Sequence, residues 1–151
     1  MIDVVSPKTR SRMMAGIKGK NTKPELMVRR ALFAQGYRFR LHRKELPGSP
    51  DVVLPGRNLA VFVHGCFWHG HAACRLAKMP ATRTEFWQAK LERNKNRDIK
   101  SIAALAELGW RVLVVWECFI RDQTDLQDLG SAMARWIEGG QVLGELFKLP
   151  Q

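Results

Sequence analysis

Residues 59–71 join an apolar segment of strand length to a loop rich in histidine and cysteine, and this junction constrains the fold more than any other feature of the chain. Residues 59–63 (LAVFV) are uniformly apolar, and the eight residues that follow (HGCFWHGH) hold three of the four histidines. Imidazoles and thiols at this density are typical of metal binding or proton transfer. Because loops at strand ends commonly carry functional residues, we expect a site built at the end of a strand.

Length and composition indicate one globular domain. The 151 residues can bury a substantial core, and the hydrophobic fraction of 46% is ordinary for such a protein. No apolar run approaches the roughly 18 residues of a membrane span, and the N-terminus lacks the pattern of a signal peptide. Three cysteines form an odd set without a disulfide framework, which favours a reducing compartment. We therefore expect a soluble cytoplasmic protein with no membrane partner.

Basic residues are concentrated in the N-terminal part of the chain. Residues 1–50 carry 12 basic and 3 acidic side chains, whereas residues 101–151 carry 4 basic and 7 acidic ones. This distribution is typical of a protein that binds a polyanion, most simply nucleic acid, although a generally basic solvated surface is the alternative. Residues 1–21 also lack hydrophobic periodicity, so we expect a basic arm that becomes ordered on its partner, followed by a single domain over residues 22–151.

Local signals predict a mixed order of helices and strands. Capping boxes at residues 22–25 and 82–85 open two helices, which Gly36 and Gly109 end, and a third helix is expected at residues 125–138. The expected strands are residues 38–41, 51–54, 59–63 and 110–116, of which the second and third form a hairpin. The order α-β-β-β-α-β-α indicates an α/β fold in which helices flank a small mixed sheet.

Three cysteines and one histidine have the composition of a zinc site. Cys66, His71 and Cys74 lie close enough for one loop to wrap an ion, and Cys118, just past the strand at 110–116, would tie that loop to the next element of the sheet. Four protein ligands close a tetrahedral site, so the zinc would be structural. The alternative is three free buried thiols.

The zinc set leaves two histidines of the loop, His64 and His69, as candidates for general acid and base work. Asp51 begins the strand that pairs with residues 59–63, so its carboxylate can lie beside the end of that strand. Asp98 shares an inward helical face with apolar residues and needs a partner there. His69 would be suitable, whereas pairing with a neighbouring basic side chain of the same helix is an equally good interpretation of the spacing.

Phe67 and Trp68 project from this polar loop, where a core role is difficult to explain. Exposed aromatic side chains beside a basic surface can stack on bases or insert between base pairs. Trp87 is a third candidate, but its place near a helix start, beside Phe86, equally favours core packing.

Several motifs of the chain resemble the very-short-patch repair DNA mismatch endonucleases. The matching segments, which lie within a resemblance running from about residue 3 to about residue 138, are residues 9–17, 46–51, 64–71, 80–87 and 107–118. The resemblance implies a restriction-endonuclease-like α/β fold with a structural zinc. It also implies Mg²⁺-dependent nicking on the 5′ side of the T in a T:G mismatch, which arises when 5-methylcytosine deaminates.

The resemblance also implies roles for individual residues. It places catalytic Mg²⁺ at Asp51 and the backbone carbonyl of Val63, and proton transfer at His64 and His69, with Asp98 orienting His69. Valine stands at position 63 where the family commonly has threonine, a change that a backbone ligand tolerates.

The same resemblance implies the zinc ligands Cys66, His71, Cys74 and Cys118, although one extra residue separates His71 from Cys74. The implied intercalating side chains are Phe67, Trp68 and Trp87, with Met14 of the arm entering from the opposite side. Glu25 resembles a supporting acid near the metal, although its capping-box position explains it equally well.

The implied partner is double-stranded DNA that contains a T:G mismatch, bound by a monomer close to the bacterial nucleoid, with mismatch-repair proteins as candidate partners. Two other functions fit the residues. One is a nicking endonuclease of the same fold with a different lesion or site specificity, and the other is a non-catalytic, zinc-stabilised DNA-binding module. A basic structural protein, such as a ribosome-associated factor, is a further alternative from a different class.

Overall fold

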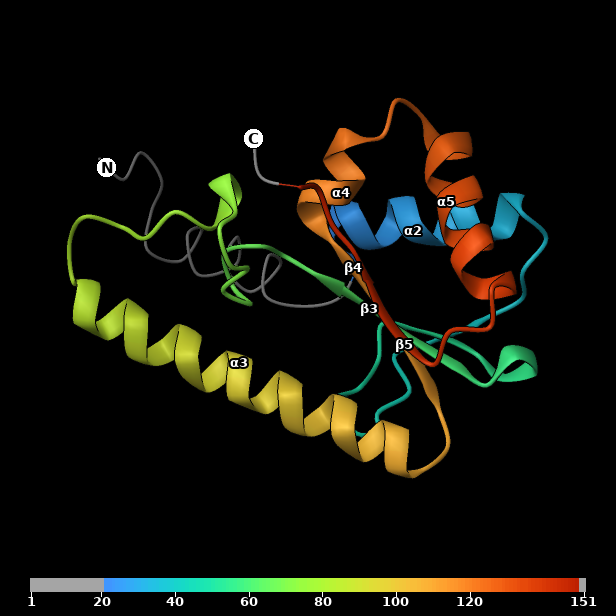
Figure 1. The fold of residues 1–151 in the computed structure, drawn as a ribbon, viewed down its shortest axis with the longest axis horizontal. Coiled ribbons are helices and arrows are strands. Elements are labelled where there is room, and N and C mark those ends of the chain that lie inside the picture. The colour runs from blue at the N-terminus through green and yellow to red at the C-terminus, as the bar shows by residue number, and fades with distance from the viewer. Residues whose placement is uncertain (1–20, 150–151) are drawn as a thin grey trace, which may run out of the picture.

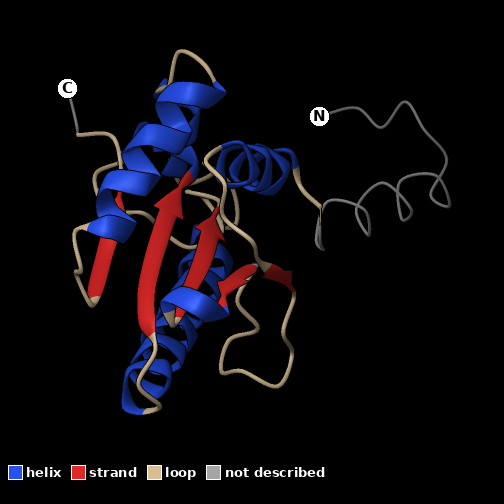
Figure 2. Ribbon diagram, turned by 90° about the vertical axis from the view of Figure 1, so that its right-hand side faces the viewer, coloured by secondary structure: helices blue, strands red, loops and turns tan. Residues whose placement is uncertain are grey.

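The computed structural model describes residues 21–149, which form a sheet between two groups of helices (Figures 1 and 2). The strands are β1 (Arg40–Leu41), β2 (Val52–Leu54), β3 (Leu59–His64), β4 (Arg111–Trp116) and β5 (Leu143–Leu146). The helices are α2 (Lys23–Ala34), α3 (Thr84–Glu107), α4 (Glu117–Asp122) and α5 (Leu126–Glu138), with short 3₁₀ turns at Pro55–Arg57 and Arg75–Ala77.

The sheet is mixed, with the strands in the order β1-β2-β3-β4-β5. The β1–β2 and β2–β3 pairs are antiparallel, whereas the β3–β4 and β4–β5 pairs are parallel. In the β3–β4 register His64 lies opposite Trp116, so these two central strands end side by side. The loop that follows β3 and the helix that follows β4 therefore start next to each other, at the C-terminal ends of these strands.

Alternation along the central strands divides the core between the two faces of the sheet. Leu59 and Val61 pack with α2 and α5 in one hydrophobic cluster, whereas Ala60 and Phe62 pack toward Leu105 of α3 in the other. This pattern is expected for a sheet with helices on both faces. The predicted fold class of a mixed sheet flanked by helices is confirmed.

Helix α3 extends well beyond the sheet toward its N-terminal end (Figure 1), and only Leu91 and Leu105 of its 24 residues are buried. The predicted capping box at residues 82–85 is wrong. Arg83 adopts a left-handed conformation with φ of 54°, and no side chain caps the helix. Because the chain turns sharply there, the Thr82 side chain is not placed to cap; the Thr84 hydroxyl instead donates to the Pro80 carbonyl at 3.4 Å.

The other expected elements are confirmed, with two corrections. The strand expected at residues 38–41 is limited to Arg40–Leu41, and both β5 and α4 were missed by the sequence pattern. The predicted basic arm, apart from Asn21, and the predicted wedge Met14 lie outside the described residues. Within residues 21–149, no helix is long and apolar enough to cross a membrane.

Candidate functional site

Four potential metal ligands meet where β3 and β4 end. Cys66 follows β3, Cys118 lies in the first turn of α4, and His71 and Cys74 belong to the loop between β3 and α3. One ligand atom from each of them lies within 4.8 Å of the others, and all the cysteines are free thiols. The fold therefore gathers the predicted set, including its distant member.

The donor atoms of this cysteine–histidine cluster are those of a four-ligand metal site. Bonds of about 2.0–2.3 Å place zinc ligands roughly 3.3–3.8 Å apart, and Cys118 Sγ lies 3.6 Å from His71 Nδ1. Two backbone N–H groups point at the sulfurs: Cys118 N donates to Cys66 Sγ at 3.3 Å, and Lys148 N donates to Cys118 Sγ at 3.4 Å. Burial raises the pKa of the Cys66 thiol, and a bound cation would favour its thiolate form.

The other two histidines of the loop form a stacked pair beside this cluster. The rings of His64 and His69 are parallel, with centroids 3.7 Å apart. His69 Nδ1 lies 2.6 Å from Asp98 Oδ2 of α3, whereas the adjacent Arg97 donates to Asn94. Asp98 therefore pairs with His69 rather than with the neighbouring Arg97 of its own helix. Since Asp98 engages Nδ1, the other ring nitrogen of His69 remains to exchange a proton with a reactant.

His64 is the more deeply buried member of the pair, with 5% of its surface exposed. Burial, and to a smaller extent the adjacent His69, lower its pKa to about 3. His64 is therefore neutral at physiological pH, and its Nδ1 has no hydrogen-bond partner within the described part of the chain. A neutral ring stacked on His69 adds no like charge when His69 takes up a proton.

Asp51 directly precedes β2 and faces the end of β3. Its Oδ2 accepts a hydrogen bond from Val63 N at 2.7 Å, which places the carboxylate beside that strand end, as expected. Burial raises the pKa of Asp51 to about 7; the Val63 hydrogen bond opposes this rise and the neighbouring Glu25 adds to it. Two carboxyl groups in one buried position are suited to binding a cation that offsets their charge.

Glu25 serves as a helix cap and as part of this acidic pair. Its backbone N donates to Thr22 Oγ1 at 3.4 Å, and its carboxylate accepts from Asn21 N at 3.0 Å. The same carboxylate oxygen lies 3.0 Å from Arg29 Nη2, which is also 2.9 Å from His42 Nε2. The position of Glu25 is therefore compatible with a role in capping α2 and with a role as a supporting acid beside Asp51.

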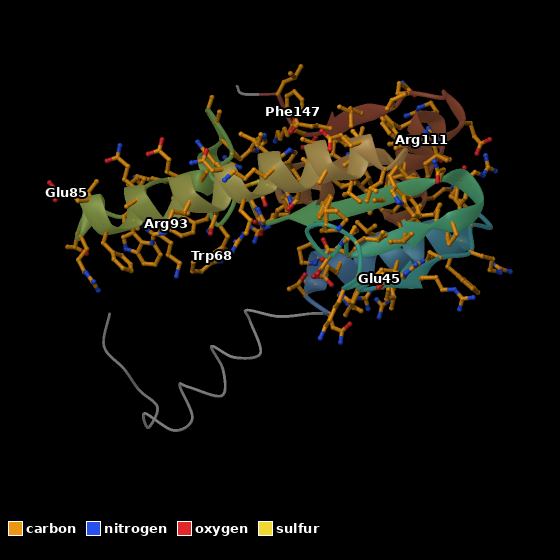
Figure 3. The ribbon with its side chains drawn as sticks, turned by 90° about the horizontal axis from the view of Figure 1, so that it is seen from below. Glu45, Trp68, Glu85, Arg93, Arg111 and Phe147 are labelled. Carbon is orange, nitrogen blue, oxygen red and sulfur yellow. The ribbon has the colours of Figure 1, made fainter. Side chains whose placement is uncertain are left out.

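Three aromatic rings form a cluster between the loop and α3. The ring centroids of Phe67, Trp68 and Trp87 lie 5.2 to 5.9 Å apart, and Trp68 lies beside α3 (Figure 3). Trp87 belongs to neither hydrophobic core cluster of the described residues, so its alternative role in core packing is wrong. Lys90 Nζ lies 5.6 Å from the Trp68 ring centroid, and Asn94 Nδ2 donates to the Trp68 carbonyl at 2.9 Å.

Most of these acids, histidines and aromatics line one cavity of about 910 Å³, whose lining includes Phe67 and Trp68 but not Trp87. The predicted site residues among its lining are Glu25, Asp51, Val63, His64, Phe67, Trp68, His69 and Asp98. None of the four members of the cysteine–histidine cluster lines it, among the residues that the structure describes. Of the three histidines in the loop, His64 and His69 therefore line the cavity, whereas His71 does not.

Four residues near the cavity were missed by sequence reasoning: Arg29, His42, Lys90 and Asn94. The four-residue spacing from Glu25 to Arg29 on one helix is a signal that could have identified Arg29. Lys90 and Asn94 follow Trp87 at helical spacing, which places them on the same face of α3. No local signal exists for His42, because only the tertiary fold brings it to Glu25.

Comparison with known proteins shows the family to which the chain belongs. Residues 2–75 match the family model described as DNA mismatch endonuclease Vsr. The chain is 52% identical to the type II nicking enzyme V.XorIIP of Xanthomonas oryzae pv. oryzae, over 89% of this chain and 94% of that protein. It is 45% identical to the DNA mismatch endonuclease Vsr of Escherichia coli K12, over 92% and 90% of the two chains.

A third relative, the type II nicking enzyme V.NmeAIP of Neisseria meningitidis, is 40% identical over 91% of this chain and 98% of that protein. By family, the chain is an endonuclease, a hydrolase that acts on DNA. The chain belongs to the Vsr family of endonucleases, and the resemblance of its motifs to that family is confirmed.

Proposed function

We propose that this protein nicks one strand of duplex DNA on the 5′ side of the T in a T:G mismatch, and that the reaction depends on Mg²⁺. The observation that carries this proposal is the single cavity in which the Asp51 carboxylate and the His69–Asp98 pair lie beside an aromatic cluster. The Vsr name of the family supports a mismatch as substrate. The proposal includes a restriction-endonuclease-like fold, a monomer on DNA and a place in the bacterial cytoplasm, where that DNA is found.

Asp51 and the Val63 carbonyl would hold Mg²⁺, with Glu25 as the supporting acid. Carboxylate and carbonyl oxygens are the ligands that Mg²⁺ prefers, and a backbone carbonyl is the same in valine as in threonine. When bound, the ion would offset the negative charge that develops on the phosphate during cleavage. The Asp51–Val63 hydrogen bond fixes the carboxylate at the strand end in readiness for this role.

Proton transfer falls to the stacked histidines. His69, whose Nδ1 is held by Asp98, would take a proton from the attacking water through its other nitrogen. The Asp98 carboxylate orients the ring and stabilises the imidazolium that forms. His64, kept neutral by burial, would help to stabilise the leaving 3′ oxygen.

The cysteine–histidine cluster would bind zinc as a structural ion, since it has four protein ligands and lies outside the cavity. It would hold the loop in a shape that places His69 against Asp98 and Phe67 and Trp68 against Trp87. These aromatics would then insert into the base stack, with Met14 of the N-terminal arm on the opposite side. Unstacking costs a few kcal/mol per step, and a weakened T:G pair lowers that cost.

The test is a nicking assay on duplexes that carry T:G, T:A or C:G at one position, in several flanking sequences, with and without Mg²⁺. We expect cleavage of the T:G duplex alone, only with Mg²⁺. His69→Ala should lower the rate by at least 10²-fold, because general-base catalysis contributes about that much or more. Its affinity for the T:G duplex should stay within about threefold, since Phe67, Trp68 and Trp87 are unchanged. Glu92→Gln, an exposed acid of α3, is the control.

A second candidate function follows from the names of the relatives. The proteins of Xanthomonas oryzae and Neisseria meningitidis are named type II nicking enzymes, so nicking at a fixed sequence without a mismatch is the alternative. Cleavage of perfectly paired DNA at the same rate as T:G duplexes would favour it. A wild-type protein that binds DNA but cleaves none of the duplexes would instead support a non-catalytic binding module.

A further inference from the structure

Arg29 contacts Glu25, the supporting acid of the proposed Mg²⁺ position, and His42 beside it. Its side chain projects from α2 and is only 12% exposed. Nη2 lies 3.0 Å from Glu25 Oε2 and 2.9 Å from His42 Nε2, and Nη1 donates to Asn21 Oδ1 at 2.7 Å. The guanidinium therefore bridges the carboxylate and the imidazole at the edge of the cavity.

Beside this guanidinium, Glu25, His42 and Asp51 have the composition of a transition-metal site. Glu25, His42 and Asp51 each offer one ligand atom, all within 4.8 Å of one another, and Glu25 Oε2 lies 3.8 Å from His42 Nε2. One imidazole with two carboxylates suits Mn²⁺, Zn²⁺ and similar ions, whereas Mg²⁺ prefers oxygen ligands alone. Such a site would retain the wrong ion.

Arg29 obstructs that site in two ways. A guanidinium has only donors, so His42 Nε2 must be the acceptor in their contact, and the electron pair that a metal would use is engaged. The positive charge in contact with Glu25 and His42 also disfavours an ion held by those two side chains.

We propose that Arg29 is a metal-selectivity residue, whose guanidinium keeps imidazole-binding transition-metal ions from the Glu25–His42–Asp51 cluster and so leaves Asp51 to Mg²⁺. This inference rests on the proposed metal-dependent cleavage at Asp51. It assigns Arg29 a positioning role, since Arg29 acts through Glu25 and His42 rather than on the DNA.

The first experiment measures Mn²⁺ binding to the zinc-loaded, DNA-free full chain by electron paramagnetic resonance. Arg29→Met keeps an apolar stem but removes the charge and the donors, and we expect it to bind Mn²⁺ at least tenfold more tightly than wild type. The double variant Arg29→Met/His42→Gln should return to within about threefold of wild type. Arg30→Met removes the same charge from the exposed neighbouring position and should change nothing.

The sign of the effect makes this test decisive. A purely structural role for Arg29 predicts weaker or unchanged Mn²⁺ binding on its removal, because loosened ligands bind less well, and either result would overturn the proposal. Arg29→Gln repeats the measurement if Arg29→Met does not fold. Arg29→Lys, which retains the charge, should stay closer to wild type than either variant.

A second measurement connects selectivity to catalysis. In Mg²⁺-supported nicking, the Zn²⁺ concentration that halves the rate should fall at least tenfold in Arg29→Met and recover in the double variant. Equal Zn²⁺ sensitivity of Arg29→Met and wild type would contradict the proposal. Absence of Mg²⁺-supported nicking by the wild type would contradict the proposed function instead, and the Mn²⁺ comparison would still decide the role of Arg29.

Discussion

Two opposing demands act on the carboxyl group of Asp51. Burial beside Glu25 favours its protonated form, whereas metal binding requires the carboxylate. The only hydrogen bond described for its side chain, from Val63 N, favours the charged form but does not offset the burial. In the free protein the Asp51 carboxylate is therefore destabilised by burial, and a bound cation would stabilise it. Such perturbed pKa values are common at functional sites.

This conflict predicts a pH-dependent penalty in the Mg²⁺-free protein. The pKa of Asp51 is about 7 in the folded state, against an ordinary value of 3.8 in the unfolded chain. Below about 4 both states are protonated; between about 4 and 7 only the unfolded state ionises, so stability falls as pH rises, and above 7 the penalty is complete. Three pKa units correspond to roughly 4 kcal/mol at most.

The measurement compares thermal unfolding of wild type and Asp51→Asn without Mg²⁺. Asparagine cannot ionise, so the Tm advantage of Asp51→Asn should grow by up to about 10 °C between pH 5 and pH 8. Asp128→Asn, an exposed substitution, should show no such growth. A Tm difference that is constant across this range would contradict the raised pKa of Asp51.

At the scale of elements, α3 and the loop before it are organised as one unit. The loop carries His69 and Trp68, while α3 supplies Asp98, Asn94 and Trp87 to hold them. None of these contacts is between neighbours in sequence. Helix α3 can extend beyond the sheet because one side of its N-terminal part is covered by the loop rather than by the core.

The sequence predicts these elements better than it predicts their junctions. Helix ends at Gly36 and Gly109 were predictable because glycine takes the positive φ found there, 92° and 89°. The start of α3 was not, because Arg83 adopts a left-handed conformation without a local signal. Strand β5 was missed because exposed residues alternate along it, so it lacks the apolar pattern of a buried strand and is specified by pairing with β4.

The same limits apply to the candidate site. Composition alone indicated the loop as a site, because histidine and cysteine are concentrated there. The separation of His69 and Asp98 along the chain left two partners for Asp98 open, and only the packing of α3 on the loop decides between them. His42 and Arg29 required the full tertiary structure.

Removing one ligand of the cysteine–histidine cluster should disorganise this loop. We expect Cys74→Ser to bind less than one zinc per chain and to lose nicking, although Cys74 lies outside the cavity lining. Loss of the ion should lower Tm by roughly 10 °C, since structural zinc contributes directly to folding. Ala72→Ser, an exposed change in the same loop, is the control. Metal analysis and thermal melting test this; a Cys74→Ser protein with full zinc content would contradict it.

Trp87 gives a test of the aromatic cluster. Its ring contacts Phe67 and Trp68, whereas the neighbouring Phe86 contacts Trp87 alone among these rings. Because stacking on a base contributes about 1–3 kcal/mol, Trp87→Ala should weaken T:G duplex binding about 5- to 100-fold, and Phe86→Ala should change it less than threefold. Fluorescence anisotropy measures both. Equal losses in the two variants would indicate a general effect on the α3 N-terminus instead of a specific wedge.

At the scale of the whole molecule, the two ends of the chain carry charges of opposite sign. Residues 1–50 are strongly basic and residues 101–151 are weakly acidic. The acidic part includes α5, which packs on the sheet face opposite to α3. A net positive charge of 11 therefore acts mainly through the N-terminal part, which favours association with DNA from that side.

Neutralising the N-terminal arm should reduce the salt dependence of DNA binding. The residues to change to glutamine in the full chain are Lys8, Arg10, Arg12, Lys18 and Lys20. Each phosphate contact adds about 0.9 to the slope of log K against log salt, so five lost contacts should lower its magnitude by about 4 to 5. Arg135→Gln, an exposed change in α5, should alter the slope by less than about 1. An unchanged slope in the arm variant would place the phosphate contacts on the described domain instead, and the arm would then contribute through side chains such as Met14 rather than through its charge.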